Sequence, residues 1–185
     1  MSSDRLTLFS YEILALIGRG GASAHDLSRM VEKGRIYAWA GVSQYYTEPK
    51  RLAALGYLDA RKEPGKTRER TFYTLTDAGL GALRAWARAP SRFPRLRHEA
   101  LVRLLAADLV GEDAVLASLA GLREDIAELA TQIEAAEADA DELPHRRTYL
   151  LLNHRLARRL LEVHLEWLDE VERELGRPTA ARESA

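Results

Sequence analysis

Apolar side chains recur every three or four positions through most of the chain, and this spacing gives way to short extended segments only near the middle. The three-to-four spacing is typical of helices that bury one face. It predicts helices at residues 6–18, 23–34, 43–55, 76–88, 97–108, 112–142 and 145–175. Residues 57–60 and 70–75, rich in aromatic and β-branched side chains, predict two strands joined through a Pro64-Gly65 turn.

Residues that favour helix ends stand at several of these boundaries. Ser43 and Thr76 are placed to cap the helices that follow them, because a hydroxyl there can accept from a backbone N–H of the first turn. Ser23 and Asp26 resemble a capping box, with Asp in place of the usual Glu. Gly56 stands where a helix ends in a left-handed residue.

The order of the first elements, three helices and then a hairpin, favours a winged helix-turn-helix at residues 1–90. Prolines at 90 and 94 mark a boundary, and we expect a second, helical domain at residues 95–175. Residues 176–185 are polar and are expected to be a disordered tail. The predicted fold class is therefore mainly α with a small two-stranded β-hairpin, plus a long-helix arm.

The last two predicted helices carry more leucine than a single helical hairpin can cover. Apolar residues from Leu116 to Ala136 follow steps of three and four, close to a coiled-coil seam. So broad an apolar surface indicates a partner chain. We expect the arm to form a homodimer through these residues: Leu122, Ile126, Leu129, Leu152, Leu156, Leu160, Val163 and Trp167.

Composition excludes several classes of protein. The 185 residues include no cysteine, which rules out disulfides and thiolate chemistry. There is neither an apolar run long enough to span a membrane nor a signal-peptide pattern, so a cytoplasmic location is expected. Residues 1–90 carry a net charge of +5 and residues 91–185 a net charge of −6. A basic head on an acidic helical body favours polyanion binding, although a charge of +5 over 90 residues also arises by chance.

Polar and basic side chains cluster on the third helix and at the hairpin tip. Such side chains can reach base edges or phosphate, so we expect contacts with double-stranded DNA. The candidates are Ser43, Gln44, Tyr45, Tyr46, Thr47, Lys50 and Arg51 on the helix, with Lys66, Arg68 and Arg70 on the hairpin. The alternatives are an ordinary solvated helix face, a core position for Tyr46, a turn-capping role for Arg51, and a merely solvated hairpin loop.

The order and spacing of these motifs resemble the PadR family of bacterial transcriptional regulators over nearly the whole chain. The resemblance lies in residues 13–21, in the stretch Ser-Gln-Tyr-Tyr-Thr-Glu-Pro-Lys-Arg-Leu with its Leu-Gly-Tyr-Leu exit within 43–58, and in Arg-Thr-Phe-Tyr-Thr-Leu-Thr-Asp-Ala-Gly at 70–79. Residues 93–95 and 167–170 are similar to the branch with a long C-terminal dimerisation domain. The resemblance implies a winged helix-turn-helix regulator that binds DNA as a dimer.

Pro49 departs from the family pattern, which usually has leucine there. A proline inside a helix removes one backbone hydrogen bond and costs about 3 kcal/mol. Either the helix kinks at Pro49, or it begins later than residue 43 with Pro49 in its first turn.

Small-molecule and metal sites receive less support. Phe9, Tyr11, Trp39 and Trp86 are candidates for an aromatic effector pocket, as the resemblance permits, although aromatic residues are more often core. The five histidines lack the short spacing to acidic partners that a helical metal site uses, so no metal and no cofactor is expected.

The reading that these patterns favour is a homodimeric DNA-binding regulator, expected to be a repressor of a palindromic operator and to be released by an effector. One alternative is a winged-helix adaptor that binds proteins without sequence-specific DNA binding. An enzyme is the other, and the sequence offers no catalytic motif for it.

Overall fold

The computed structural model describes residues 5–33, 41–64, 69–94 and 96–176. The chain divides into two compact units, Met1–Phe93 and Pro94–Ala185. The N-terminal unit contains α1 (Leu8–Ile17), β1 (Ala22–Ser23), α2 (Ala24–Lys33), α3 (Gln44–Ala54), β2 (Leu58–Glu63), β3 (Arg70–Leu75) and α4 (Asp77–Ala87). The C-terminal unit contains α5 (Glu99–Leu105), α6 (Ala107–Val110), α7 (Glu112–Asp139), η2 (Ala140–Glu142) and α8 (Arg147–Leu175).

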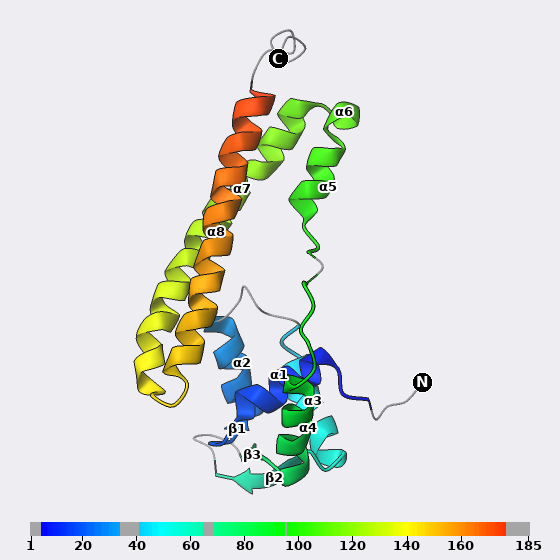
Figure 1. Ribbon diagram of the computed structural model, residues 1–185, viewed down its shortest axis with the longest axis vertical. Coiled ribbons are helices and arrows are strands. Elements are labelled where there is room, and N and C mark those ends of the chain that lie inside the picture. The colour runs from blue at the N-terminus through cyan, green and yellow to red at the C-terminus, as the bar shows by residue number, and fades with distance from the viewer. Residues whose placement is uncertain (1–4, 34–40, 65–68, 95, 177–185) are drawn as a thin grey trace. The chain divides into compact units, whose positions relative to one another are not determined.

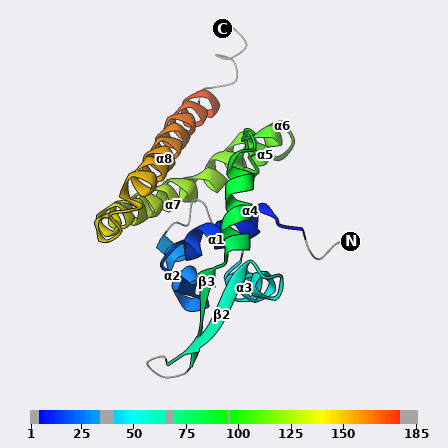
Figure 2. The same cartoon turned by 60° about the horizontal axis from the view of Figure 1, so that its bottom comes forward.

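The N-terminal unit is a winged helix-turn-helix, as the sequence predicted (Figure 1). Its sheet has a third strand that the sequence did not indicate: β1 pairs antiparallel with β3, and the strand order is β1-β3-β2. A two-residue strand has too short a pattern to be recognised. Figure 2 shows the β2–β3 hairpin lying beside α3, and the two elements are in contact.

The core of this unit forms where α1, α2, α3 and the sheet meet. The apolar stripe of α1 is fully buried, as are a residue of α2 and two aromatic rings. The core residues are Ile13, Leu14, Ile17, Ala22, Leu27, Tyr45, Leu52, Leu58 and Tyr73. Burial of this apolar surface is the main source of stability for the unit, and it holds α3 against α1 and β2.

Three of the four predicted helix-end signals are confirmed. The Ser23 hydroxyl and the Asp26 carboxylate form a capping box, with Asp26 Oδ2 accepting from the Ser23 backbone N–H at 3.0 Å. Thr76 caps α4 by accepting from the Gly79 N–H at 3.1 Å. Gly56, with φ +78°, ends α3, and the Tyr57 N–H donates to the Leu52 carbonyl at 3.0 Å.

The predicted cap at Ser43 is wrong. Ser43 already has helical backbone angles and makes no side-chain cap hydrogen bond. The preceding residues form a tight turn in which the Gln44 and Tyr45 N–H groups donate to the Gly41 and Val42 carbonyls. These backbone bonds satisfy the donors that a serine cap would have served.

The turn after α3 is tied to the start of α4. The Thr76 hydroxyl donates to the Gly56 carbonyl at 2.7 Å, and the Thr76 N–H donates to the Tyr57 carbonyl at 3.3 Å. Gly79 is buried there, and a side chain on it would collide with the Tyr57 carbonyl. Glycine in the Thr-Asp-Ala-Gly stretch is therefore required by this close approach of two backbones.

The C-terminal unit is built on two long antiparallel helices, α7 and α8, which pack along each other (Figure 1). The helix predicted at 97–108 is instead two short helices, α5 and α6, separated at Ala106. The long helices predicted at 112–142 and 145–175 are confirmed with small shifts at their ends. Residues 177–185 of the expected tail lie outside the described residues.

Candidate nucleic-acid interface

Helix α3 has one buried face and one polar exposed face. Tyr45, Pro49 and Leu52, spaced by four and three residues, point into the core. The exposed positions carry most of the predicted DNA contacts: Ser43, Gln44, Tyr46, Thr47 and Lys50. A polar helix face that remains open beside a hairpin can supply donors and acceptors to base edges.

Tyr45 is a core residue, so its predicted role as a DNA contact is wrong. Its side chain is 1% exposed, its ring meets Phe9 edge to face at 5.0 Å, and its hydroxyl donates to Glu12 Oε1 at 2.9 Å. Burial raises the pKa of Glu12 above its usual value, while the hydrogen bond from Tyr45 opposes this rise. Tyr46, by contrast, is 39% exposed, so the core alternative for it does not hold.

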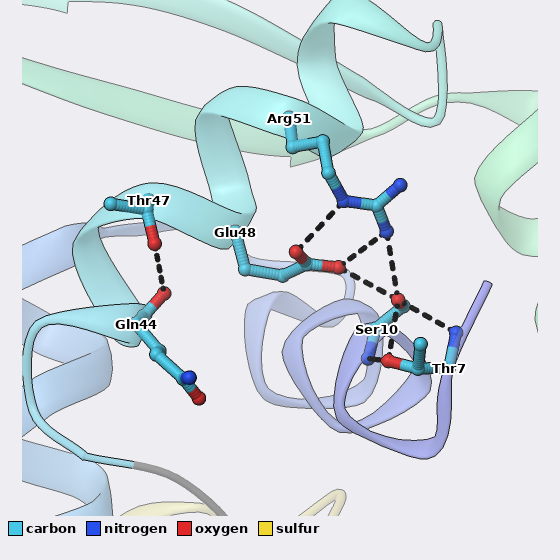
Figure 3. A network of polar contacts seen from close by, with 6 residues as sticks. All are labelled: Thr7, Ser10, Gln44, Thr47, Glu48 and Arg51. Atoms are coloured by element: carbon cyan, nitrogen blue, oxygen red, sulfur yellow. Dashed lines mark hydrogen bonds and ion pairs between the residues drawn. The ribbon is translucent and has the colours of Figure 1, made fainter. Parts of the chain in front are cut away.

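Arg51 is partly buried and binds inside its own unit. Its Nε and Nη2 atoms donate to the two oxygens of Glu48 at 2.9 and 2.7 Å. Its Nη2 also donates to the hydroxyl of Ser10 on α1 at 3.0 Å. Figure 3 shows Arg51, Glu48 and Ser10 together, with Gln44 and Thr47 nearer the start of the helix. The expectation that Arg51 contacts DNA therefore finds no support in this geometry.

Pro49 lies inside α3 rather than in its first turn, since the helix begins at Gln44. The alternative of a later helix start is therefore wrong. Pro49 is fully buried, so its ring contributes to the core face even though its nitrogen cannot donate a helical hydrogen bond.

The described part of the hairpin carries cations that are partly paired. Arg70 lies 3.5 Å from Glu63 and 3.8 Å from Asp26, and its guanidinium stands over the Phe72 ring. Arg61 donates to Glu63 at 2.8 Å, also over Phe72, and remains 66% exposed. Lys66 and Arg68, which were predicted to contact phosphate, lie outside the described residues.

The residues predicted to line an effector pocket do not form one cluster in the described structure. Phe9 packs on Tyr45, whereas Tyr11 stacks on Trp86 with ring centroids 4.9 Å apart. Trp86 is 44% exposed, and Trp39 lies outside the described residues.

Helix α8 presents a second kind of surface. Tyr149, Leu152, Leu156 and Val163 are each more than half exposed, and their spacing puts them on one stripe with Leu160. The buried residues of α8, which face its own unit, are Ala157, Leu161, Leu168 and Val171.

The predicted dimerisation residues therefore divide into three groups. Leu152, Leu156 and Val163 are exposed, whereas Leu122, Leu129, Leu160 and Trp167 are partly buried. Ile126 is 4% exposed within its own unit, so its prediction as an interface residue is wrong. The heptad-like spacing on α7 serves the packing within this unit at Val115, Leu119, Ile126, Ile133 and Ala136.

No group of three or more potential metal ligands gathers in the described parts of the chain. None of the helices described is long and apolar enough to cross a membrane.

Ser10, Glu12 and Glu48 position α3 but were not among the predicted site residues. The three-residue spacing of Glu48 and Arg51 could have indicated their ion pair. The contacts of Ser10 and Glu12 with α3 join residues more than 30 positions apart, so no local pattern could have shown them.

Comparisons with known proteins agree with this architecture. Residues 96–176 match the family model described as virulence activator alpha C-term. A search of curated proteins finds no match.

Several solved structures have the same fold. The structure of *Bacillus subtilis* PadR in complex with operator DNA is 18% identical, with a TM-score of 0.79, and the match covers 93% of this chain and 99% of that one. The same protein in complex with p-coumaric acid is 19% identical, with a TM-score of 0.67 and coverage of 92% and 96%. The *Vibrio cholerae* virulence activator AphA is 23% identical, with a TM-score of 0.71 and coverage of 90% and 97%. The resemblance inferred from the motifs is thus confirmed at the level of fold: the chain has the winged-helix architecture of PadR-type regulators, with a C-terminal region similar to that of the virulence activators.

Proposed function

We propose that this protein is a DNA-binding transcriptional regulator that reads its operator through the exposed face of α3. The observation that carries the proposal is the polar stripe of Gln44, Thr47 and Lys50, left open on a helix whose other face is buried. Gln is suited to adenine, and Lys to guanine or phosphate. The operator complex of the PadR relative supports the same use of this fold.

The regulator acts as a homodimer held by the exposed stripe on α8. Leu152, Leu156 and Val163 are 54%, 54% and 57% exposed in the single chain, and such a row of aliphatic side chains is stabilised when a second copy covers it. Two copies place two α3 helices in successive major grooves. The operator is then an imperfect palindrome with half-sites roughly 10 bp, or a multiple of this, apart.

The proposed outcome of binding is repression, because a dimer seated on a promoter blocks access of the polymerase. An aromatic acid is the proposed class of effector. The p-coumaric acid complex of the PadR relative supports this class, as does the half-exposed Trp86 ring stacked on Tyr11 in this chain.

Selection of bound duplexes from random fragments at about 150 mM salt tests the function, because purely electrostatic binding is weak at that salt. We expect an enriched palindrome with the stated spacing. Unpatterned binding that fades with salt would contradict the proposal and favour the protein-interaction adaptor. A reporter driven by the recovered sequence then distinguishes repression from activation.

A further inference from the structure

The side chain of Ser10 is fully buried, yet its hydroxyl uses its whole hydrogen-bonding capacity at the contact between α1 and α3. It donates to Glu48 Oε1 at 2.7 Å and accepts from Arg51 Nη2 at 3.0 Å and from the Thr7 backbone N–H at 2.9 Å. A hydroxyl offers one donor and two lone pairs, so all three are occupied. The same oxygen therefore closes the cap of α1 and holds two residues of α3.

One edge of the Arg51 guanidinium is occupied by this contact. The edge formed by Nε and Nη2, which could recognise guanine in a bidentate way, lies instead on the Glu48 carboxylate. The Glu48 side chain is only 13% exposed. Burial alone would raise the pKa of Glu48, but hydrogen bonds from Arg51 and Ser10, with the positive charge of Arg51, bring that pKa below its usual value. The pair is thus an ionised, hydrogen-bonded unit directed at α1.

A second contact joins the same two helices one turn earlier. The Tyr45 hydroxyl donates to Glu12 Oε1 at 2.9 Å, so Tyr45 and Glu48, about one turn apart on α3, bind Glu12 and Ser10, two residues apart on α1. These two contacts bracket the place where the backbone of α3 is weakest, because Pro49 cannot donate to the Tyr45 carbonyl. Side-chain hydrogen bonds to α1 thus hold α3 at the place where one of its backbone hydrogen bonds is missing.

We propose that Arg51 and Glu48, through Ser10, are positioning residues that fix the orientation of α3 on α1 and thereby set the base preference of the whole half-site, although neither reads a base. The proposal rests on the DNA-binding function proposed above. It assigns to Arg51 a role that differs from that of its neighbour Lys50, whose side chain is exposed.

The first test needs no DNA. A double-mutant cycle in the full chain compares Glu48→Gln, Arg51→Met and the double variant by urea unfolding followed by circular dichroism. Because the two residues act as one unit, we expect each single change to lower the unfolding midpoint and the double change to lower it little further. Lys50→Met, which removes the same charge from the next residue, should leave the midpoint unchanged. Additive effects of Glu48→Gln and Arg51→Met would overturn the proposal, whatever the protein binds.

The second test selects bound duplexes with the wild type and with each folded variant. For Glu48→Gln and for Arg51→Met we expect about a tenfold loss of affinity for the recovered duplex. We also expect a weaker base preference at several positions of the half-site. Lys50→Met should instead change one position or the salt dependence alone. If Arg51→Met changes a single base position while Glu48→Gln leaves binding intact, then Arg51 reads that base and the proposal is wrong. If the wild type selects no sequence, the proposed function fails, and the unfolding cycle still decides whether the contact fixes α3.

Discussion

Helices α3 and α8 each bury one face in their own unit, and they differ in what the remaining face offers to a partner. The free face of α3 carries Gln44, Thr47 and Lys50, whereas that of α8 carries Leu152, Leu156 and Val163. Polar and cationic side chains are stable when they are exposed to water, and a bound polyanion can take the place of that water. Exposed aliphatic side chains gain about 25 cal/mol for each Å² that a partner covers. The same amphipathic rule therefore points to DNA at one helix and to a second copy of the chain at the other.

The two helices also differ in how they are held. Most residues buried on α8 are aliphatic, and the salt bridges of Arg123 with Asp169 and Glu172 are largely exposed. Helix α3 adds buried polar contacts, from Tyr45 to Glu12 and from Glu48 and Arg51 to Ser10. Apolar packing tolerates sliding and repacking, whereas hydrogen bonds require a set geometry. Hydrogen-bonded contacts therefore suit α3, because this helix must present its base-reading side chains in one orientation.

The largest effect should come from a charge on the apolar stripe of α8. Leu156→Glu should give monomers and lower operator affinity by ~100-fold or more, because a carboxylate cannot be buried between two aliphatic surfaces and one half-site alone binds weakly. Sedimentation and fluorescence anisotropy measure the two effects. Glu162→Lys is the control, since it lies about 100° round the helix from Val163. A Leu156→Glu variant that remains dimeric would show that the stripe is not the interface.

A smaller effect is expected at the polar face of α3. Gln44→Ala should cost about 1–3 kcal/mol of operator binding and relax preference at one base position, because the lost side chain is a direct reader. The check is selection of duplexes with the variant beside the wild type. Unchanged preference would remove Gln44 from the base contacts.

The hairpin tip should give a uniform, salt-dependent effect. Lys66→Ala or Arg68→Ala is expected to weaken binding on all sequences alike and to flatten the slope of log affinity against log salt by about one unit. Titrations from low to physiological salt measure this slope. A slope that stays the same in both variants would exclude the hairpin from the interface.

The smallest effect concerns the stability of the C-terminal unit. His98 stacks on His164 at 4.9 Å and meets Trp167 edge to face, and burial, with the charge of His164, lowers the pKa of His98 below 6.5. Because the folded state then disfavours the protonated ring, His98 contributes its full stability above about pH 6.5 and loses it as pH falls through the lowered value.

The variant His98→Phe should lose less folding stability than the wild type as the pH falls. Thermal unfolding of both proteins from pH 8 to pH 5 is the measurement, with His145→Phe, an exposed position, as the control. An equal acid dependence in His98→Phe and the wild type would exclude His98 as its source.

Local patterns were enough to predict most elements of this fold. The Ser23–Asp26 box, the Thr76 cap and the left-handed Gly56 each depend on residues within four positions of one another, and all were found. The Ser43 cap failed because the backbone turn before it satisfied the same donors. Tyr45 and Arg51 were predicted at the DNA surface because their chemistry suits it. Their partners Glu12 and Ser10 come from a different helix, and only the fold brings them together.

We propose that operator recognition requires two α3 helices, which act as a pair because α8 joins the two chains. The most direct test is the affinity of the full-length protein for the recovered duplex compared with duplexes in which one or the other half-site is scrambled. We expect two chains on the intact duplex, and an affinity within about tenfold of non-specific binding when either half-site is lost. One chain per duplex, or full affinity for a single half-site, would contradict this pairing of two α3 helices.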